Sequence, residues 1–154
     1  MVKLEKCIII NAPVEKVFAY AEDPMSNLEW LPGIVEVKDV TRTEQGVGTH
    51  FRWAYKMAGL RFEGESTFTE YVPNERIVTQ SEGGIVSTWT WTYEPHDGGT
   101  KVSLVLEYTV PIPVLGKLAE AVVLKQNERN ADQAMANIKA KVESLNPTSL
   151  VGYG

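Results

Sequence analysis

Apolar and polar residues alternate along most of the chain before residue 110, and this pattern predicts a β-sheet. In residues 50–57, Phe51, Trp53, Tyr55 and Met57 share one face, whereas His50, Arg52, Ala54 and Lys56 share the other. A period of two is typical of a strand with one buried face. A segment that starts at Ile34 and five further ranges bring the prediction to seven strands: 2–10, 60–69, 75–82, 85–94 and 100–110.

The connections between these segments are short and rich in residues that favour turns. They are 45–48, 58–59, 73–74, 83–84 and 97–99, and glycine, proline, asparagine or aspartate occurs in each. Short connections of this kind join antiparallel neighbours. The sequence therefore predicts that the middle of the chain is an antiparallel meander.

Helical periodicity appears only at the two ends of this meander. Asn11 and Pro13 predict a helix start, apolar residues at helical spacing follow, and Asp23 with Pro24 ends the run. A second short helix is predicted over residues 25–31. Residues 114–145 predict one long helix of roughly 48 Å at 1.5 Å per residue, long enough to cross the whole sheet.

The long helix carries an apolar stripe that turns polar in its middle. Ala131, Met135, Ile138, Val142 and Leu145 share one face. The stripe extends back through Asn127 or Glu128 to Leu124, across a polar run at 125–130. Two interpretations stay open. The helix either bulges or ends its contact with the sheet there, so that these polar groups are solvated, which is the commoner arrangement, or the polar groups face a space beneath the helix.

One helix cannot fill the concave side of a curved sheet, so a cavity is expected beneath it. The alternative is a dry core of packed aromatic side chains. Ser66, Thr79, Ser81 and Ser87 fall on the inward face and could supply polar groups, and Gly64 could mark a bulge. The residues predicted to contact a ligand are Trp53, Tyr55, Phe62, Ser66, Phe68, Ser87, Trp89, Trp91, Tyr108, Leu124, Asn127 and Glu128.

Length and charge narrow the class of protein. The 154 residues suit one domain, predicted over residues 1–146 and followed by a loose tail at 147–154. The net charge is −5 and no basic run occurs, so nucleic-acid binding is not expected. Cys7 is the single cysteine, which excludes an internal disulfide and a multi-thiolate metal site. We expect a cytoplasmic protein without membrane insertion, since no apolar stretch reaches the roughly 20 residues that a span requires.

Side chains suited to acid–base chemistry are few. His50 lies on the solvent face of its strand and His96 in a turn, so both are expected at the surface. Glu70 shares the inward parity of its strand near the end, and Tyr55, Tyr93, Tyr108, Glu128 and Arg129 could approach the cavity. The sequence therefore predicts no catalytic residue, no metal site and no cofactor.

Three segments resemble a known superfamily. Residues 10–18, 23 and 30–33 are similar to its entry segment, residues 91–102 to its penultimate hairpin, and residues 111–118 to the lead into its long helix. On these segments the chain resembles the helix-grip (SRPBCC) superfamily of START-like proteins, in the branch of polyketide cyclases/dehydrases and coenzyme-Q-binding-like proteins. The resemblance implies an α+β fold in which a curved, seven-stranded antiparallel sheet grips the C-terminal helix.

The resemblance also implies a tunnel for lipids, isoprenoid quinones or polyketide-like molecules. Since the superfamily's enzymes share no single catalytic signature, no catalytic residue carries over. We therefore expect a carrier or sensor that binds a hydrophobic small molecule. The alternatives are a cyclase or dehydratase that works without a cofactor, and an adaptor that binds a protein partner through its outer face or through Leu150, Val151 and Tyr153.

Overall fold

The computed structural model describes residues 1–109 and 117–145. Seven strands form one antiparallel sheet in the order β1-β7-β6-β5-β4-β3-β2. The strands are β1 (Val2–Ile10), β2 (Ile34–Thr41), β3 (His50–Met57), β4 (Leu60–Val72), β5 (Arg76–Gly83), β6 (Ser87–His96) and β7 (Gly99–Tyr108). The predicted seven-stranded antiparallel sheet is confirmed.

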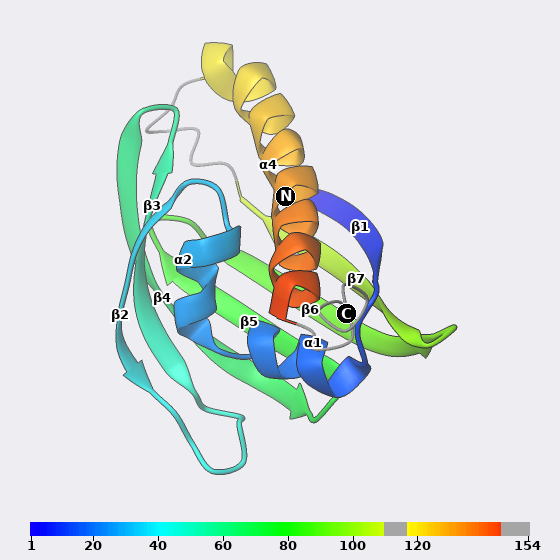
Figure 1. Cartoon of the computed structure of the whole chain (residues 1–154). Coiled ribbons are helices and arrows are strands. Elements are labelled where there is room, and N and C mark those ends of the chain that lie inside the picture. Colours follow the sequence, from blue (N-terminus) through cyan, green and yellow to red (C-terminus); the bar gives the residue numbers. More distant parts are fainter. Residues whose placement is uncertain (110–116, 146–154) are drawn as a thin grey trace.

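Among the described residues, four helical segments lie on the inner side of this curved sheet. They are α1 (Val14–Ala21), the 3₁₀ turn η1 (Pro24–Ser26), α2 (Asn27–Trp30) and α4 (Lys117–Leu145). Figure 1 shows α4 running along the concave side of the sheet, with α1 and α2 near its C-terminal end. This is the helix-grip arrangement that the sequence predicted. Residues 114–116 of the expected helix and the tail at 147–154, with Leu150, Val151 and Tyr153, lie outside the described residues.

The first two strands occupy opposite edges of the sheet. β1 pairs with β7, from Val2 opposite Tyr108 to Ile10 opposite Thr100, and β2 pairs with β3. Residues 11–33 therefore cross from one edge to the other, which places α1 and α2 over one end of the concave side. Asn11 does not cap α1 as predicted, because Pro13 is the N-cap residue and the Asn11 N–H donates to Glu143 of α4 at 2.8 Å.

β4 contains a bulge, but it begins at Phe68, four residues beyond Gly64, where the sequence suggested one. Gly64 pairs regularly with Trp53 of β3 and Gly83 of β5, whereas the register with β5 shifts between Phe68 and Glu70. A bulge inserts one extra residue and reverses the in–out alternation that follows it. The predicted inward orientation of Glu70 is therefore wrong, since its carboxylate is exposed and pairs with Arg76 at 2.7 Å.

The inner face of α4 packs on the sheet through an apolar stripe. Ala131, Met135, Ile138 and Val142 are buried, as predicted. Leu145, in contrast, is 63% exposed. It is the last residue of α4, beyond the core, and it borders a surface groove that residues of α1 also line. Within residues 1–109 and 117–145, no helix has both the length and the apolar character needed to cross a membrane.

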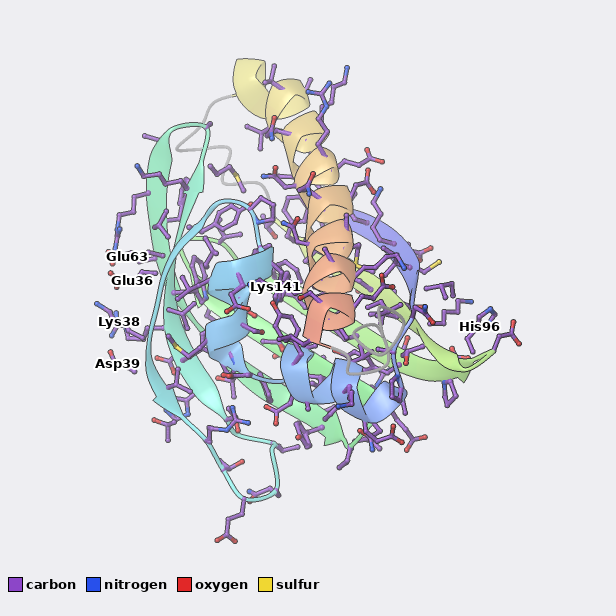
Figure 2. The ribbon with its side chains drawn as sticks, viewed as in Figure 1. Glu36, Lys38, Asp39, Glu63, His96 and Lys141 are labelled. Atoms are coloured by element: carbon purple, nitrogen blue, oxygen red, sulfur yellow. The ribbon has the colours of Figure 1, made fainter. Side chains whose placement is uncertain are left out.

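Charged side chains gather on the outer surface. Figure 2 shows Glu36, Lys38, Asp39 and Glu63 pointing away from α4 on the side of β2 and β4, and His96 at the far end of the β6–β7 hairpin. In the described part of the chain, no group of three or more histidine, cysteine, aspartate or glutamate side chains is arranged to hold a metal ion. These charged groups therefore lie apart from the inner side of the sheet.

Candidate functional site

A partly open cavity of about 140 Å³ lies between the inner face of the sheet and helices α2 and α4. Its lining is mostly apolar and comes from both layers, because alternate residues of β3 to β7 point inward beneath the helix. The hollow that the sequence predicted is therefore present. Mostly apolar concave sites with a few polar groups are typical of small-molecule pockets.

Three tryptophans form one wall of the cavity. Trp89 and Trp91 of β6 are stacked, with ring centroids 6.3 Å apart and an interplanar angle of 17°. Trp30 of α2 meets Trp91 edge-on at 5.6 Å, and its Nε1 donates to Ser26 Oγ at 3.1 Å. Paired contacts of this kind hold the rings in place, so the wall presents fixed flat surfaces to the cavity.

Polar groups on the sheet side of the cavity are bonded mainly to one another. Ser66 and Ser81 lie opposite each other on β4 and β5, and their hydroxyl oxygens are 2.5 Å apart. Trp89 Nε1 donates to Ser87 Oγ at 3.0 Å. These contacts reduce the energetic cost of burying hydroxyl groups in an apolar lining.

Polar groups on the helix side join α4 to two distant strands. Asn127 Nδ2 donates to the phenol oxygen of Tyr108, the last residue of β7, at 3.1 Å. Asn130, one turn further along α4, also lines the cavity, and its side chain lowers the pKa of Tyr55 of β3. All four side chains line the cavity. The polar interruption in the stripe of α4 therefore faces the sheet at Asn127.

Both phenols are held in their neutral form. Burial raises the pKa of Tyr55, and the side chain of Asn130 lowers it only in part. Burial likewise raises the pKa of Tyr108, and Asn127 offsets part of the effect. Among the described residues that line the cavity, none carries a charge. A ligand therefore meets an uncharged environment in which the phenols can donate protons to hydrogen bonds.

The Trp53 ring packs against the backbone of the neighbouring strand. A Cβ atom at Gly64 would lie 2.3 Å from Trp53 Cζ2 and 2.1 Å from the Glu82 carbonyl oxygen. Glycine is therefore required at this position for close approach, rather than for a bulge. Trp53 Nε1 is buried and has no hydrogen-bond partner within residues 1–109 and 117–145.

Residues 1–143 match the family described as polyketide cyclase / dehydrase and lipid transport. The chain belongs to this family. Comparison with curated protein sequences gives no match.

Solved structures share the fold of this polyketide cyclase/dehydrase family member. TTHA0849 from Thermus thermophilus is 25% identical, with a TM-score of 0.80, and the alignment covers 94% of this chain and 99% of that one. The Zhui aromatase/cyclase from Streptomyces sp. R1128 is 14% identical, with a TM-score of 0.70, covering 92% and 93%. The di-domain ARO/CYC StfQ of the steffimycin biosynthetic pathway is 17% identical, with a TM-score of 0.74. The alignment with StfQ covers 93% of this chain and 51% of that one.

Nine of the twelve residues predicted to contact a ligand line the cavity of this family member. The nine are Trp53, Tyr55, Ser66, Phe68, Ser87, Trp89, Trp91, Tyr108 and Asn127. Phe62 is buried in the core, and Leu124 is half-buried against it, but neither is part of the lining. Glu128 lies on the outer side of α4, where it is exposed and 3.4 Å from Lys6 of β1.

Both histidines lie outside the lining. His50 is half-buried, with Nδ1 3.0 Å from the Gly48 carbonyl oxygen, and His96 is exposed beside Asp97. Tyr93, in contrast, does line the cavity. Sequence reasoning missed Trp30 and Asn130 as lining residues. Trp30 lay within the entry segment that carried the resemblance, whereas Asn130 had no signal beyond its place in the polar run.

Alkaline pH is expected to destabilise the fold through Tyr93. Burial, with a smaller effect of Glu22, raises the pKa of Tyr93 well above the value of about 10 in an unfolded chain. This stabilisation is complete below about pH 10 and is lost as the pH rises through the folded-state pKa. Urea unfolding between about pH 9 and 11 should show a decline to which Tyr93 contributes up to about 1.4 kcal/mol per pH unit. Tyr93→Phe should remove that share, and an unchanged slope would contradict the prediction.

Proposed function

We propose that this protein binds one neutral, mainly apolar small molecule between its sheet and α4, and that it acts as a carrier or sensor for that molecule. The single observation that carries the proposal is the uncharged, mostly apolar cavity beneath α4. Membership of a family that includes lipid transport supports it.

The size of the cavity bears on how a ligand is accommodated. At about 140 Å³, it is close to an engineered cavity of about 150 Å³ that binds benzene. One ring therefore fits without rearrangement. A lipid, a quinone with an isoprenoid tail or a polyketide would require α2 or α4 to move outward, and we propose that the short helix α2 gives way first, because it has only four residues.

A polyketide cyclase is the second candidate, because two of the fold relatives are named as aromatase/cyclases. Cyclisation needs a group that removes a proton from the substrate. The titratable side chains in the described lining are Tyr55, Tyr93 and Tyr108, and burial raises the pKa of each. Neutral phenols donate hydrogen bonds but are poor bases at neutral pH. We therefore favour binding over catalysis.

Filling the cavity should weaken ligand binding without unfolding the protein. Ala131 lines the cavity from α4, whereas Ala136 of the same helix is exposed. We expect Ala131→Leu to weaken the binding of ethylbenzene by at least about tenfold, equivalent to about 1.4 kcal/mol, and Ala136→Leu to leave it unchanged. Titrations followed in the ¹H–¹⁵N NMR spectrum would measure both affinities, and thermal unfolding would check that both variants fold.

Equal ethylbenzene affinities in the two variants would place binding elsewhere, and no saturable binding to the wild-type protein would refute the proposal. Native mass spectrometry of protein purified from its own cells tests the natural occupant. The carrier or sensor role would be supported if the wild-type protein and the Ala136→Leu variant retain an apolar molecule of defined mass and the Ala131→Leu variant does not.

A further inference from the structure

We infer that Tyr55 and Tyr108 together form a hydrogen-bond donor site beneath α4 that selects a neutral ligand carrying a carbonyl oxygen, such as a ketone or a quinone. This inference rests on the proposed function, because it assigns a chemical class to the ligand of the same cavity. It follows from how the two phenols and the two amides of α4 are connected.

The amides of α4 act as donors toward the phenols. Asn127 Nδ2 donates to the Tyr108 phenol oxygen at 3.1 Å. Gln126 Nε2 donates to the Oδ1 atom of Asn130 at 2.9 Å, so the amide of Asn130 is oriented with its carbonyl oxygen occupied. Its NH₂ group is therefore the part of the amide left to act on Tyr55, whose pKa the Asn130 side chain lowers. The phenol oxygen of Tyr108 therefore accepts a hydrogen bond from the helix, and the side chain of Asn130 acts on the phenol of Tyr55.

The two phenols serve the same part of the cavity. Asn127 and Asn130 are three residues apart on α4, a spacing that puts their Cβ atoms about 5–6 Å apart on one face of the helix. Tyr55 and Tyr108 both line the cavity, and the charge of one affects the ionisation of the other. Strands β3 and β7 are separated by three strands in the sheet, and the helix brings their tyrosines together.

Within residues 1–109 and 117–145, the O–H group of each phenol is available to a ligand. In the described part of the chain, neither hydroxyl donates to an acceptor. Trp53 Nε1 is a further buried donor of the same lining without a described partner. A buried donor without a partner is unfavourable by about 1–3 kcal/mol. A carbonyl oxygen, which has two lone pairs and no charge, satisfies such donors without requiring a cation.

The sheet side of the cavity offers less to a ligand. The hydroxyls of Ser66 and Ser81 bond to each other at 2.5 Å, so one of the two protons is already used. A carboxylate ligand would find no positively charged side chain in the described lining. The pair of phenols is thus the site best matched to a neutral acceptor.

Acetophenone and ethylbenzene test this site, because they are similar in shape and differ in the carbonyl oxygen. We expect the wild-type protein to prefer acetophenone. Tyr55→Phe and Tyr108→Phe should each weaken acetophenone binding by about fivefold to tenfold and change ethylbenzene binding by less than about twofold. Tyr20→Phe is the matched control, since the Tyr20 hydroxyl donates to Glu29 at 2.9 Å outside the cavity.

The carbonyl stretch of acetophenone labelled with ¹³C gives a readout that a purely structural role would not move. Its infrared frequency should be lowered in the wild-type protein and rise when both tyrosines are replaced by phenylalanine. The paired site would be wrong if both ligands bind but fewer than two of the single variants, Tyr55→Phe and Tyr108→Phe, change the preference for acetophenone. The proposed function would still stand in that case. If the tyrosine variants lost affinity for acetophenone and ethylbenzene equally, the paired site would also be wrong, because the substitutions would then act by changing the shape of the cavity. If the wild-type protein binds neither ligand, the proposed function fails with it.

Discussion

Replacing Gly64 with alanine is expected to lower the free energy of unfolding by about 3 kcal/mol, at the upper end of the usual range for overpacking. The new Cβ atom would lie 2.1 Å from the Glu82 carbonyl oxygen and 2.3 Å from Trp53 Cζ2. β4 is hydrogen-bonded on both sides, to β3 and β5, so its backbone cannot withdraw without breaking a ladder. The Trp53 ring would be pushed into the cavity, and ethylbenzene affinity should fall as well. Urea unfolding and NMR titration measure the two effects.

Gly59→Ala is the control for this variant. Gly59 has a φ of +78°, but no described heavy atom lies within 4 Å of a Cβ built there. Alanine at this position meets only the backbone strain of the left-handed region, about 1 kcal/mol. Ligand affinity should be unaffected. If Gly64→Ala lost no more stability than Gly59→Ala and bound ethylbenzene normally, the close approach of Trp53 to β4 would be wrong.

Gly33→Ala is expected to combine both kinds of strain and to remove carbonyl selectivity. Gly33 has a φ of +93°, and a Cβ there would lie 2.7 Å from Tyr55 Cζ and 3.0 Å from its hydroxyl oxygen. The loss of stability should be about 2 kcal/mol, because backbone strain is unavoidable whereas the ring can swing aside. That swing separates Tyr55 from Asn130. Acetophenone affinity should therefore fall as far as it does in Tyr55→Phe, with ethylbenzene affinity nearly unchanged.

A thermodynamic cycle isolates the part of this effect that acts through the phenol. Gly33→Ala in a Tyr55→Phe background should cause little further loss of acetophenone affinity, since the hydroxyl is already absent. Gly59→Ala, which has backbone strain without a tyrosine neighbour, should keep the full preference for acetophenone. A Gly33→Ala protein that retained this preference would show that the turn at Gly33 does not position Tyr55.

The sequence was sufficient to predict the sheet, because strict alternation fixes which face of a strand is buried. Trp53, Trp91 and Leu104 are buried where a period of two places them. The bulge in β4 was not predictable in this way. Alternation carried through Thr69 puts Glu70 inside, and only the register with β5 reveals the extra residue that turns it out.

The long helix shows a second limit of local patterns. Its periodicity left Asn127 and Glu128 as equal candidates at the edge of the apolar stripe. Contacts with distant strands determine which of the two faces the sheet. Asn127 donates a hydrogen bond to Tyr108 of β7, whereas Glu128 pairs with Lys6 of β1. Asn130 was missed for the same reason, because its partner Tyr55 lies on β3. Contacts between residues so far apart in sequence leave no trace in the spacing of either segment.

The pairing of β1 with β7 also shapes how the chain folds during its synthesis. Val2 needs Tyr108 as its neighbour, so the earliest strand remains unpaired until the ribosome has released the last one. At the usual rate of translation this interval is on the order of 5–20 seconds. Throughout it, the apolar side chains of β1 lack their neighbours on β7, and closure of the sheet is a late event because it depends on long-range contacts.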